Sequence, residues 1–509
     1  MRLLRLMCTW GVAPGPDGAP ACWRGVKHVY GCPSTCVPAL AALCPGLEAL
    51  SISLQDSNGV LFHDAAAALA SLTGLTSLRI AFNRTEDPAC GKGAHLSFWR
   101  RESVAALRAL TRLRSLVVFT GGASLGFHSW ADWVKGLTAL TELQLVGLLP
   151  AVTAQPTGLR RLVLEGVGAI GLSSQLTGIA AAGLAQLTQL RCTSWFDRAG
   201  QPLPFGPALA AVAGLVDLSL PAARLAQGHL EALASAAPQL TRLEAASITA
   251  SDECTAEFPK LCTLAAAFGP GYNYNLGLLA PQLQRLELAP SKVDEEDIIT
   301  SAAGTLQELA MRGAFKDFCR NGRDSFSWVG CVDATTFEIS DQLDLAAPID
   351  KKTMVRDVLL ELLSNLGGLG FMAQLSLTVA HQPDAALSLV AAAGTFSGLQ
   401  RLRLRYVASL VPLDRVVGLL LYFRGLEELE LEEGPTSSMC DESFDDSCLD
   451  LLEAGRPKSL TKVTLTDTWC VTRECVDAVQ RRAAARGWPL EVVLDCSDAE
   501  LLGARGSPR

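Results

Sequence analysis

Leucines recur along this chain in a six-residue pattern whose last positions alternate with polar residues. One copy runs from Leu399 to Leu404 and reads L-x-x-L-x-L, with arginines between its last two leucines and on either side of them. A second copy runs from Leu426 to Leu431, 27 residues later, and carries glutamates in the same places. Apolar residues that alternate with charged residues predict a short strand with one buried face and one face in water.

The same hexad occurs along most of the chain, and many copies follow each other at about 28 residues. Its copies begin at Leu47, Leu75, Leu113, Leu140, Leu159, Leu187, Leu215, Leu240, Leu261, Leu283, Leu306, Met372, Leu399, Leu426 and Leu460. A repeated unit of this length predicts stacked supersecondary units that bury their leucines against one another.

The spacing of the hexads is uneven in a few places. The longest step, from Leu306 to Met372, leaves room for one further repeat, and Val332–Phe337 is the candidate for its hexad. A final strand is expected at Leu490–Leu494, where it would close the array.

Alanine-rich amphipathic segments separate the hexads, and several begin at an acidic residue, Ser or Thr, as a capped helix does. The segments expected to be helical are Asp64–Leu72, Arg101–Leu110, Gln175–Leu187, Leu225–Ala237, Asp294–Ala303, Ala385–Ala393, Arg415–Phe423 and Thr472–Arg486. A repeated strand and helix predict an α/β solenoid, a curved horseshoe with parallel strands on its concave face and helices on its convex face.

A hexad of this form at a period of 20–29 residues is the signature of a leucine-rich repeat. Over roughly Leu47 to Leu494 the chain resembles the ribonuclease-inhibitor-like leucine-rich-repeat superfamily, including the repeat region of F-box-type proteins. The resemblance implies a scaffold for protein–protein interaction. It also implies two narrower alternatives, a substrate-recognition subunit of a ubiquitin ligase and a leucine-rich-repeat GTPase activator.

An F-box is a helical module that opens near a Leu-Pro pair and precedes the repeats. None of the prolines before Leu47 follows a leucine, and the first helix candidate, Val37–Leu43, already belongs to the array. The ligase alternative therefore requires an F-box that is missing here or divergent.

The hexads divide the chain into five segments. Residues 1–46 are expected to cap the array, 47–311 to form repeats, and 312–371 to form an irregular insertion with one degenerate repeat. Residues 372–496 are expected to form further repeats with a C-terminal cap, and 497–509 a flexible tail.

Composition narrows the class of partner and the compartment. The formal net charge of −9 argues against a nucleic-acid-binding protein, which carries a basic surface. The apolar stretch Met1–Met7 is interrupted by Arg5 and is too short for a secretory signal. No run of 18 uncharged apolar residues predicts a membrane span. We therefore expect an intracellular, cytoplasmic protein with reduced thiols, and the resemblance adds the cytoskeleton or the ciliary axoneme as a location.

Candidate chemistry is sparse. One cluster of thiols and imidazole near the N-terminus has irregular spacing and no C-x-x-C pair, so it predicts small buried side chains rather than a zinc site. Its members are Cys22, His28, Cys32, Cys36 and Cys44. The histidines of the chain lie in different repeats, so no nucleophile and base are brought together. We predict a non-enzymatic protein with no cofactor, metal or small-molecule substrate.

The outward positions of the predicted strands are the candidate contacts for a protein partner, because arginine and aromatic side chains dominate binding energy at interfaces. The candidates are Phe119, Arg161, Arg191, Trp195, Arg242, Arg285, Arg401, Arg403, Arg405, Glu428, Glu430 and Glu432.

The copies at Leu399–Leu404 and Leu426–Leu431 predict a specific pairing. Equivalent residues of adjacent parallel strands stand side by side, so the pairs would be Arg401 with Glu428, Arg403 with Glu430, and Arg405 with Glu432. Taken alone, the arginines suggest a nucleic-acid or acidic-peptide contact. Taken with their neighbours, they predict a cross-strand ion ladder, and hence no nucleic-acid site there.

Overall fold

A computed structural model describes the chain over the following residues: 25–54, 62–82, 108–119, 136–146, 158–165, 186–193, 213–251, 253–269, 275–289, 301–302, 305–313, 336–341, 373–378, 398–405, 423, 425–432, 446–455, 459–466 and 471–495. The chain forms two compact units. The first comprises Met1–Ala246 with Thr255–Lys260, and the second comprises Ser247–Cys254 with Leu261–Arg509.

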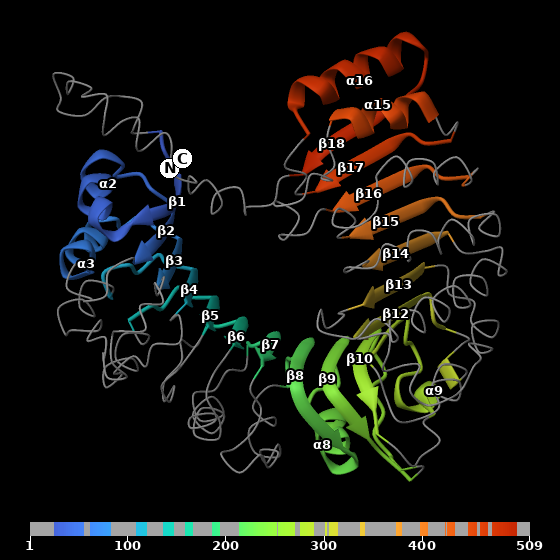
Figure 1. The fold of residues 1–509 in the computed structure, drawn as a ribbon. Coiled ribbons are helices and arrows are strands. Elements are labelled where there is room, and N and C mark those ends of the chain that lie inside the picture. Colours follow the sequence, from blue (N-terminus) through green and yellow to red (C-terminus); the bar gives the residue numbers. More distant parts are fainter. Residues whose placement is uncertain are drawn as a thin grey trace, which may run out of the picture. The chain divides into compact units, whose positions relative to one another are not determined.

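The first unit is a run of parallel strands in chain order, from β1 to β8 and the start of β9 (Figure 1). The strands are β1 (His28–Pro33), β2 (Ala49–Leu54), β3 (Ser77–Phe82), β4 (Ser115–Phe119), β5 (Glu142–Val146), β6 (Arg161–Glu165), β7 (Gln189–Cys192), β8 (Asp217–Ala226) and β9 (Arg242–Thr249).

The second unit repeats this arrangement from β10 to β18, again with each strand parallel to the next. Its strands are β10 (Thr263–Phe268), β11 (Arg285–Leu288), β12 (Glu308–Gly313), β13 (Thr336–Asp341), β14 (Gln374–Thr378), β15 (Arg401–Arg405), β16 (Glu428–Glu432), β17 (Lys462–Thr466) and β18 (Glu491–Asp495).

Every hexad leads into a strand that begins two residues after its first leucine, and β18 matches the expected final strand. The first, fourth and sixth residues of the hexad form the core. In the second described repeat these are Leu75, Leu78 and Ile80, each with no exposed surface. Burying a leucine side chain stabilises a fold by about 1.5–3 kcal/mol, so three such residues in each unit favour stacking.

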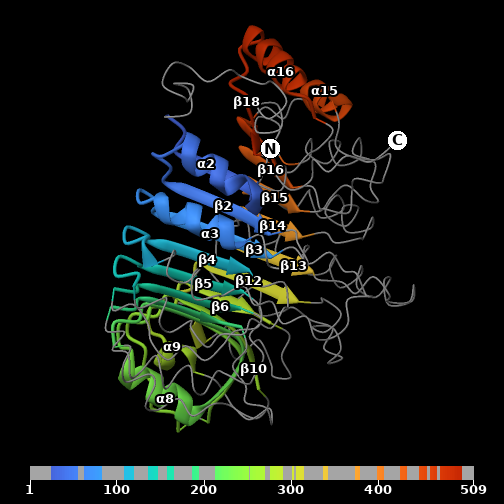
Figure 2. The same ribbon diagram turned by 90° about the vertical axis from the view of Figure 1, so that its left-hand side faces the viewer.

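Helices lie on one face of the strands. Figure 2 shows α2 (Val37–Leu43) and α3 (Phe62–Ser71) side by side along the first strands of the chain. The other α-helices of the described residues are α8 (Gln227–Ala236), α9 (Leu276–Leu279), α15 (Asp446–Gly455) and α16 (Arg473–Ala485).

The helix predictions are confirmed where the structure describes the residues. The helix α16 begins after Thr472, whose hydroxyl oxygen accepts a hydrogen bond from the Cys475 backbone N–H at 3.2 Å. The helices α2, α3 and α8 also lie in expected segments. The remaining expected helices, Arg101–Leu110, Gln175–Leu187, Asp294–Ala303, Ala385–Ala393 and Arg415–Phe423, lie wholly or mostly outside the described residues.

The strand β13 corrects the alignment expected for the long step between Leu306 and Met372. It pairs with β12 and β14, with Phe337 opposite Leu309 and Leu375, so Phe337 holds the fourth position of its hexad. The hexad therefore begins at Ala334, two residues later than predicted. The reason is the alternation itself, because Phe337 and Ile339 supply two apolar residues two apart, and this period determines register.

The strand β1 was not predicted, since its segment was assigned to the cap. It pairs with β2, and its register shifts between Val29 and Cys32. Gly31, inside this interval, has a φ of 63°, which glycine adopts without steric cost. The bulge interrupts the alternation of apolar and polar residues, so β1 contains no hexad and the leucine pattern did not predict this strand.

Threonine at the second hexad position links neighbouring repeats. In each case its hydroxyl donates a hydrogen bond to the carbonyl of the equivalent residue in the preceding repeat, at 3.1–3.2 Å. The donors are Thr76, Thr141, Thr188, Thr241 and Thr461. The same carbonyls accept backbone N–H groups, so this side chain adds a third donor to each junction.

Candidate functional site on the open face

The chain is an α/β leucine-rich-repeat solenoid, and its strands present the third and fifth residues of each hexad on the face opposite the helices. We call this the open face. The burial pattern follows directly from the hexad, because in β4 and β16 the fourth and sixth residues are buried while the residues between them are partly exposed.

In the first unit, the predicted contact Phe119 lies on the open face beneath an arginine. The guanidinium carbon of Arg79 is 4.6 Å from the centre of the Phe119 ring, which is a cation–π contact. Phe119 is half-buried. The ring is therefore partly covered by the protein itself.

Arg161 on β6 and Arg191 on β7 lie two and three strands further along this face, and both are exposed. The Nε atom of Arg191 is 3.2 Å from a carboxylate oxygen of Glu165. Nearby, Arg242 approaches Glu244 at 4.0 Å, and Glu244 also accepts a 2.6 Å hydrogen bond from the Ser219 hydroxyl. These arginines belong to a face of mixed charge rather than to a basic stripe.

Asp217 lies among these arginines, and burial is the largest influence on the pKa of its carboxyl group. Desolvation raises the pKa of its carboxyl group above the ordinary range, against the opposing effect of Arg242. Its neighbour Glu244 acts in the same direction as burial.

In the second unit, the predicted ladder is present between β15 and β16. The register places Arg401, Arg403 and Arg405 opposite Glu428, Glu430 and Glu432. Arg401 contacts Glu428 at 3.2 Å, and Arg403 contacts Glu430 at 2.9 Å. These two ion pairs confirm the cross-strand prediction.

The third pair is also in the predicted register, with Arg405 opposite Glu432. Glu432 also contacts Arg403 at 3.2 Å, although it lies two residues beyond Glu430, the residue directly opposite Arg403. The side chain of Arg405 lies outside the described residues. An arginine is long enough to reach a diagonal neighbour as well as the residue directly opposite, so Arg403 joins two glutamates.

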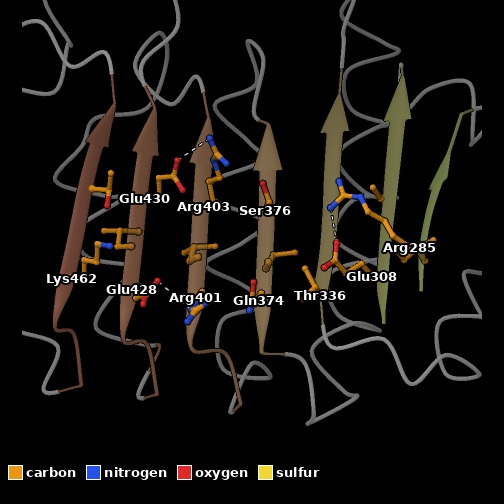
Figure 3. Close-up of a pocket in the computed structure, with 16 residues that line it drawn as sticks. Arg285, Glu308, Thr336, Gln374, Ser376, Arg401, Arg403, Glu428, Glu430 and Lys462 are labelled. Carbon is orange, nitrogen blue, oxygen red and sulfur yellow. Dashed lines mark hydrogen bonds and ion pairs between the residues drawn. The ribbon is translucent and has the colours of Figure 1, made fainter. Parts of the chain in front are cut away.

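A groove of about 330 Å³ lies on the open face of the second unit, next to this ladder (Figure 3). Its middle is lined by short side chains of β12, β13 and β14, among them Ala310, Thr336 and Ser376. Charged side chains of β11, β12, β15, β16 and β17 flank it on both sides. The groove is hollow because small residues stand between long ones.

The β11–β12 side of the groove is held by Arg285. Its guanidinium contacts Glu287 at 2.8 Å and Glu308 at 2.6 Å, and only 3% of the Glu287 side chain is exposed. Burial alone would lower the pKa of Arg285, but its hydrogen bonds to these two glutamates outweigh burial and raise it. The charge of this arginine is therefore held in place at one edge of the groove.

The N-terminal thiols lie away from this face. Burial, with a smaller contribution from Cys36, raises the pKa of Cys32 to about 12, and burial raises the pKa of Cys44. Both thiols are therefore protonated at neutral pH. Two predicted residues, Cys22 and the partner contact Trp195, lie outside the described residues.

Within the described ranges, no group of three or more His, Cys, Asp and Glu side chains could hold a metal ion. No helix in the same ranges combines the length and the apolar character that a membrane span needs.

The chain matches no protein-family model and no curated protein. Among solved structures it is similar to the TLR13–ssRNA13 complex, with 14% identity, a TM-score of 0.34, and coverage of 90% of this chain and 50% of that chain. The yeast Rad7–Elc1 complex gives 13% identity, a TM-score of 0.23, and 88% and 78% coverage. CroV588, a circular leucine-rich-repeat protein, is 10% identical with a TM-score of 0.26, and the match covers 91% of this chain and 68% of that chain. The chain thus spans half the length of the first of these, and similarity this low carries no argument about function.

The predicted contacts are distributed over both units. Arg285, Arg401, Arg403, Glu428 and Glu430 line the groove of the second unit, whereas Phe119, Arg161, Arg191 and Arg242 belong to the first unit. The contacts predicted from the sequence are large side chains, and the small side chains that make the groove were not among them. The signal was present, because Thr336, Gln374 and Ser376 hold outward positions that are charged in neighbouring strands.

Proposed function

We propose that this chain is a non-enzymatic scaffold for protein–protein interaction, and that its partner binds to the open face of the second unit. The observation that supports this proposal is the groove between the charged edges at β11–β12 and β15–β17. Its polar, fixed side chains suit hydrogen bonds and ion pairs with a protein segment. Sites for small molecules, in contrast, are mostly apolar and enclosed.

The extent of the groove fits an extended partner. It runs from residues of β11 to residues of β17, and neighbouring strands lie about 4.8 Å apart, so its length is about 29 Å. An extended peptide rises about 3.3 Å per residue, so a segment of about nine residues would fill it.

Filling the floor of the groove tests the proposal. Ser376→Trp places a large side chain in the middle of the groove, and the matched control is Ser51→Trp on β2. Both serines are half-buried and hold the fifth position of a hexad. We expect the wild type and Ser51→Trp to retain the same proteins from native extract, and Ser376→Trp to lose them while its unfolding midpoint is unchanged.

Two results would contradict the proposal: retention of the same partners by Ser376→Trp, or their loss from Ser51→Trp. The proteins that depend on the groove would also decide between the narrower roles, since ligase subunits, cytoskeletal proteins and a GTPase each point to a different one.

A further inference from the structure

The third hexad positions of the second unit form one column across the sheet, because the strands are parallel and in register. From β11 to β18 the column is Arg285, Glu308, Thr336, Gln374, Arg401, Glu428, Lys462 and Glu491. We call it the charge column. Its signs alternate throughout, except at two neutral residues in the middle.

The two ends of this gap carry opposite charges. Glu308 is paired with Arg285 on its outer side at 2.6 Å, and its register neighbour on the inner side is the neutral Thr336. Arg401 is paired with Glu428 on its outer side at 3.2 Å, and its inner neighbour is the neutral Gln374. Figure 3 shows Glu308 and Arg401 on opposite sides of Thr336 and Gln374.

Both groups that border the gap are open to a partner. The exposed fraction of the side chain is 41% for Glu308 and 55% for Arg401. A carboxylate has several acceptor positions and a guanidinium has five N–H donors, so one ion pair leaves each of them able to make another.

The distance between Glu308 and Arg401 determines which backbone conformation of a bound segment can reach both residues. Glu308 and Arg401 are three strands apart, which is about 14 Å. Four residues of an extended chain span about 13 Å, and residues i and i+4 of such a chain point to the same side. A helix would need about nine residues for this distance.

We propose that the gap in the charge column binds an extended protein segment that crosses β13 and β14. The segment places a basic residue against Glu308 and an acidic residue, four positions away, against Arg401. Small or polar residues lie between them, over Thr336 and Gln374. This inference rests on the proposed function and specifies the chemistry of its partner.

Charge complementarity favours a peptide over the two polyanions that could otherwise reach an arginine. Nucleic acid and an anionic membrane are negative throughout, so each would place like charge against Glu308. A segment with both signs satisfies both ends of the gap.

The test uses the full chain and synthetic peptides whose binding is measured by fluorescence anisotropy. The probe is a flexible peptide with Lys-Ser-Thr-Ser-Glu at its centre. The control peptides carry Lys at both ends, Glu at both ends, or the Lys and Glu only two residues apart. We expect the probe to bind severalfold more tightly than every control, and this preference to shrink in high salt.

Two protein variants of equal composition sharpen the test. Thr336→Lys with Gln374→Glu completes the alternation from within, so it should abolish the preference for the probe and raise the unfolding midpoint. Thr336→Glu with Gln374→Lys adds the same charges in the opposite order, so it should lower the midpoint and keep the preference.

Equal binding of all peptides, no binding of any peptide, or displacement of the probe by RNA or anionic vesicles would overturn the inference. The proposed function can survive that outcome, because it depends on loss of captured partners by Ser376→Trp. Partners that are lost from Ser376→Trp and yet bind both charge-order variants equally would contradict the inference alone.

Discussion

Arg403 is the residue at which the ion ladder can be tested most cleanly. Its guanidinium contacts Glu430 at 2.9 Å and Glu432 at 3.2 Å. Its register neighbour on the other strand is the neutral Ser376, and the neighbour of Glu430 beyond it is the neutral Thr464. A change of sign at Arg403 or Glu430 therefore acts on the ladder and on no other charged residue of the same column.

The magnitude follows from the exposure of these side chains. The exposed fraction of the side chain is 36% for Arg403 and 32% for Glu430. Each ion pair therefore contributes about 0.5 kcal/mol to the free energy of unfolding, within the range for partly exposed pairs. Arg403→Glu exchanges two attractions for two repulsions of similar size and should cost about 2 kcal/mol. Adding Glu430→Arg restores one attraction and should recover about half of that loss.

The assay is denaturant unfolding of the four proteins of a double-mutant cycle: the wild type, both single variants and the double variant. We expect the two changes to be non-additive by about 2 kcal/mol, and the non-additivity to decrease in high salt. Additive changes, or non-additivity that salt does not affect, would refute the ladder.

The neighbouring pair, Arg401 and Glu428, provides a control, because its outcome depends on a third strand, β17, as well as on β15 and β16. Exchanging the signs of Arg401 and Glu428 places an arginine beside Lys462 on β17. Like charges opposite each other destabilise a sheet. This exchange should therefore recover less stability than the exchange at Arg403 and Glu430.

Four further predictions concern other parts of the structure. Thr76→Val removes one inter-repeat hydrogen bond of 3.1 Å and should cost about 0.5–1.5 kcal/mol in denaturant unfolding. Arg482→Met breaks a 2.6 Å contact with the carboxylate of Glu453, which is only 6% exposed, and should lower the unfolding midpoint in denaturant, whereas Arg481→Met removes only a hydrogen bond to a backbone carbonyl and should lower it less. Asp217 has a raised pKa in the folded state, so its contribution to stability falls as pH rises through its unfolded and then its folded pKa, and Asp217→Asn should be relatively more stabilising at pH 7 than in acid. Cys32, with a pKa of about 12, should resist alkylation at pH 8 in the folded chain and react after unfolding, which peptide mapping would detect.

The sequence by itself determined the strands and much of their register. Each hexad buries its fourth and sixth residues, as Leu402 and Leu404 illustrate, and a slip of one residue would turn them to the open face. Local alternation therefore places equivalent residues of successive hexads side by side, which is why the pairing of Arg401 with Glu428 could be read from the sequence.

Where the hexad pattern weakens, only the tertiary structure determined the secondary structure, the register and the side-chain contacts. The strand β1 has no hexad, the helix α15 is not alanine-rich, and the register of β13 depends on whether Phe337 takes the fourth or the sixth position of its hexad. The diagonal contact of Arg403 with Glu432 depends on the reach of a long side chain, which the alternation of residues does not specify.

The groove is a property of the folded sheet for the same reason. Thr336, Gln374 and Ser376 do not stand out in the sequence, and Glu308, which borders them, precedes Thr336 by 28 residues and Ser376 by 68. A hexad specifies which side chains point outward from one strand. How deep the surface is at that point depends on the lengths of the side chains on the strands beside it, and those strands become neighbours only when the repeats stack.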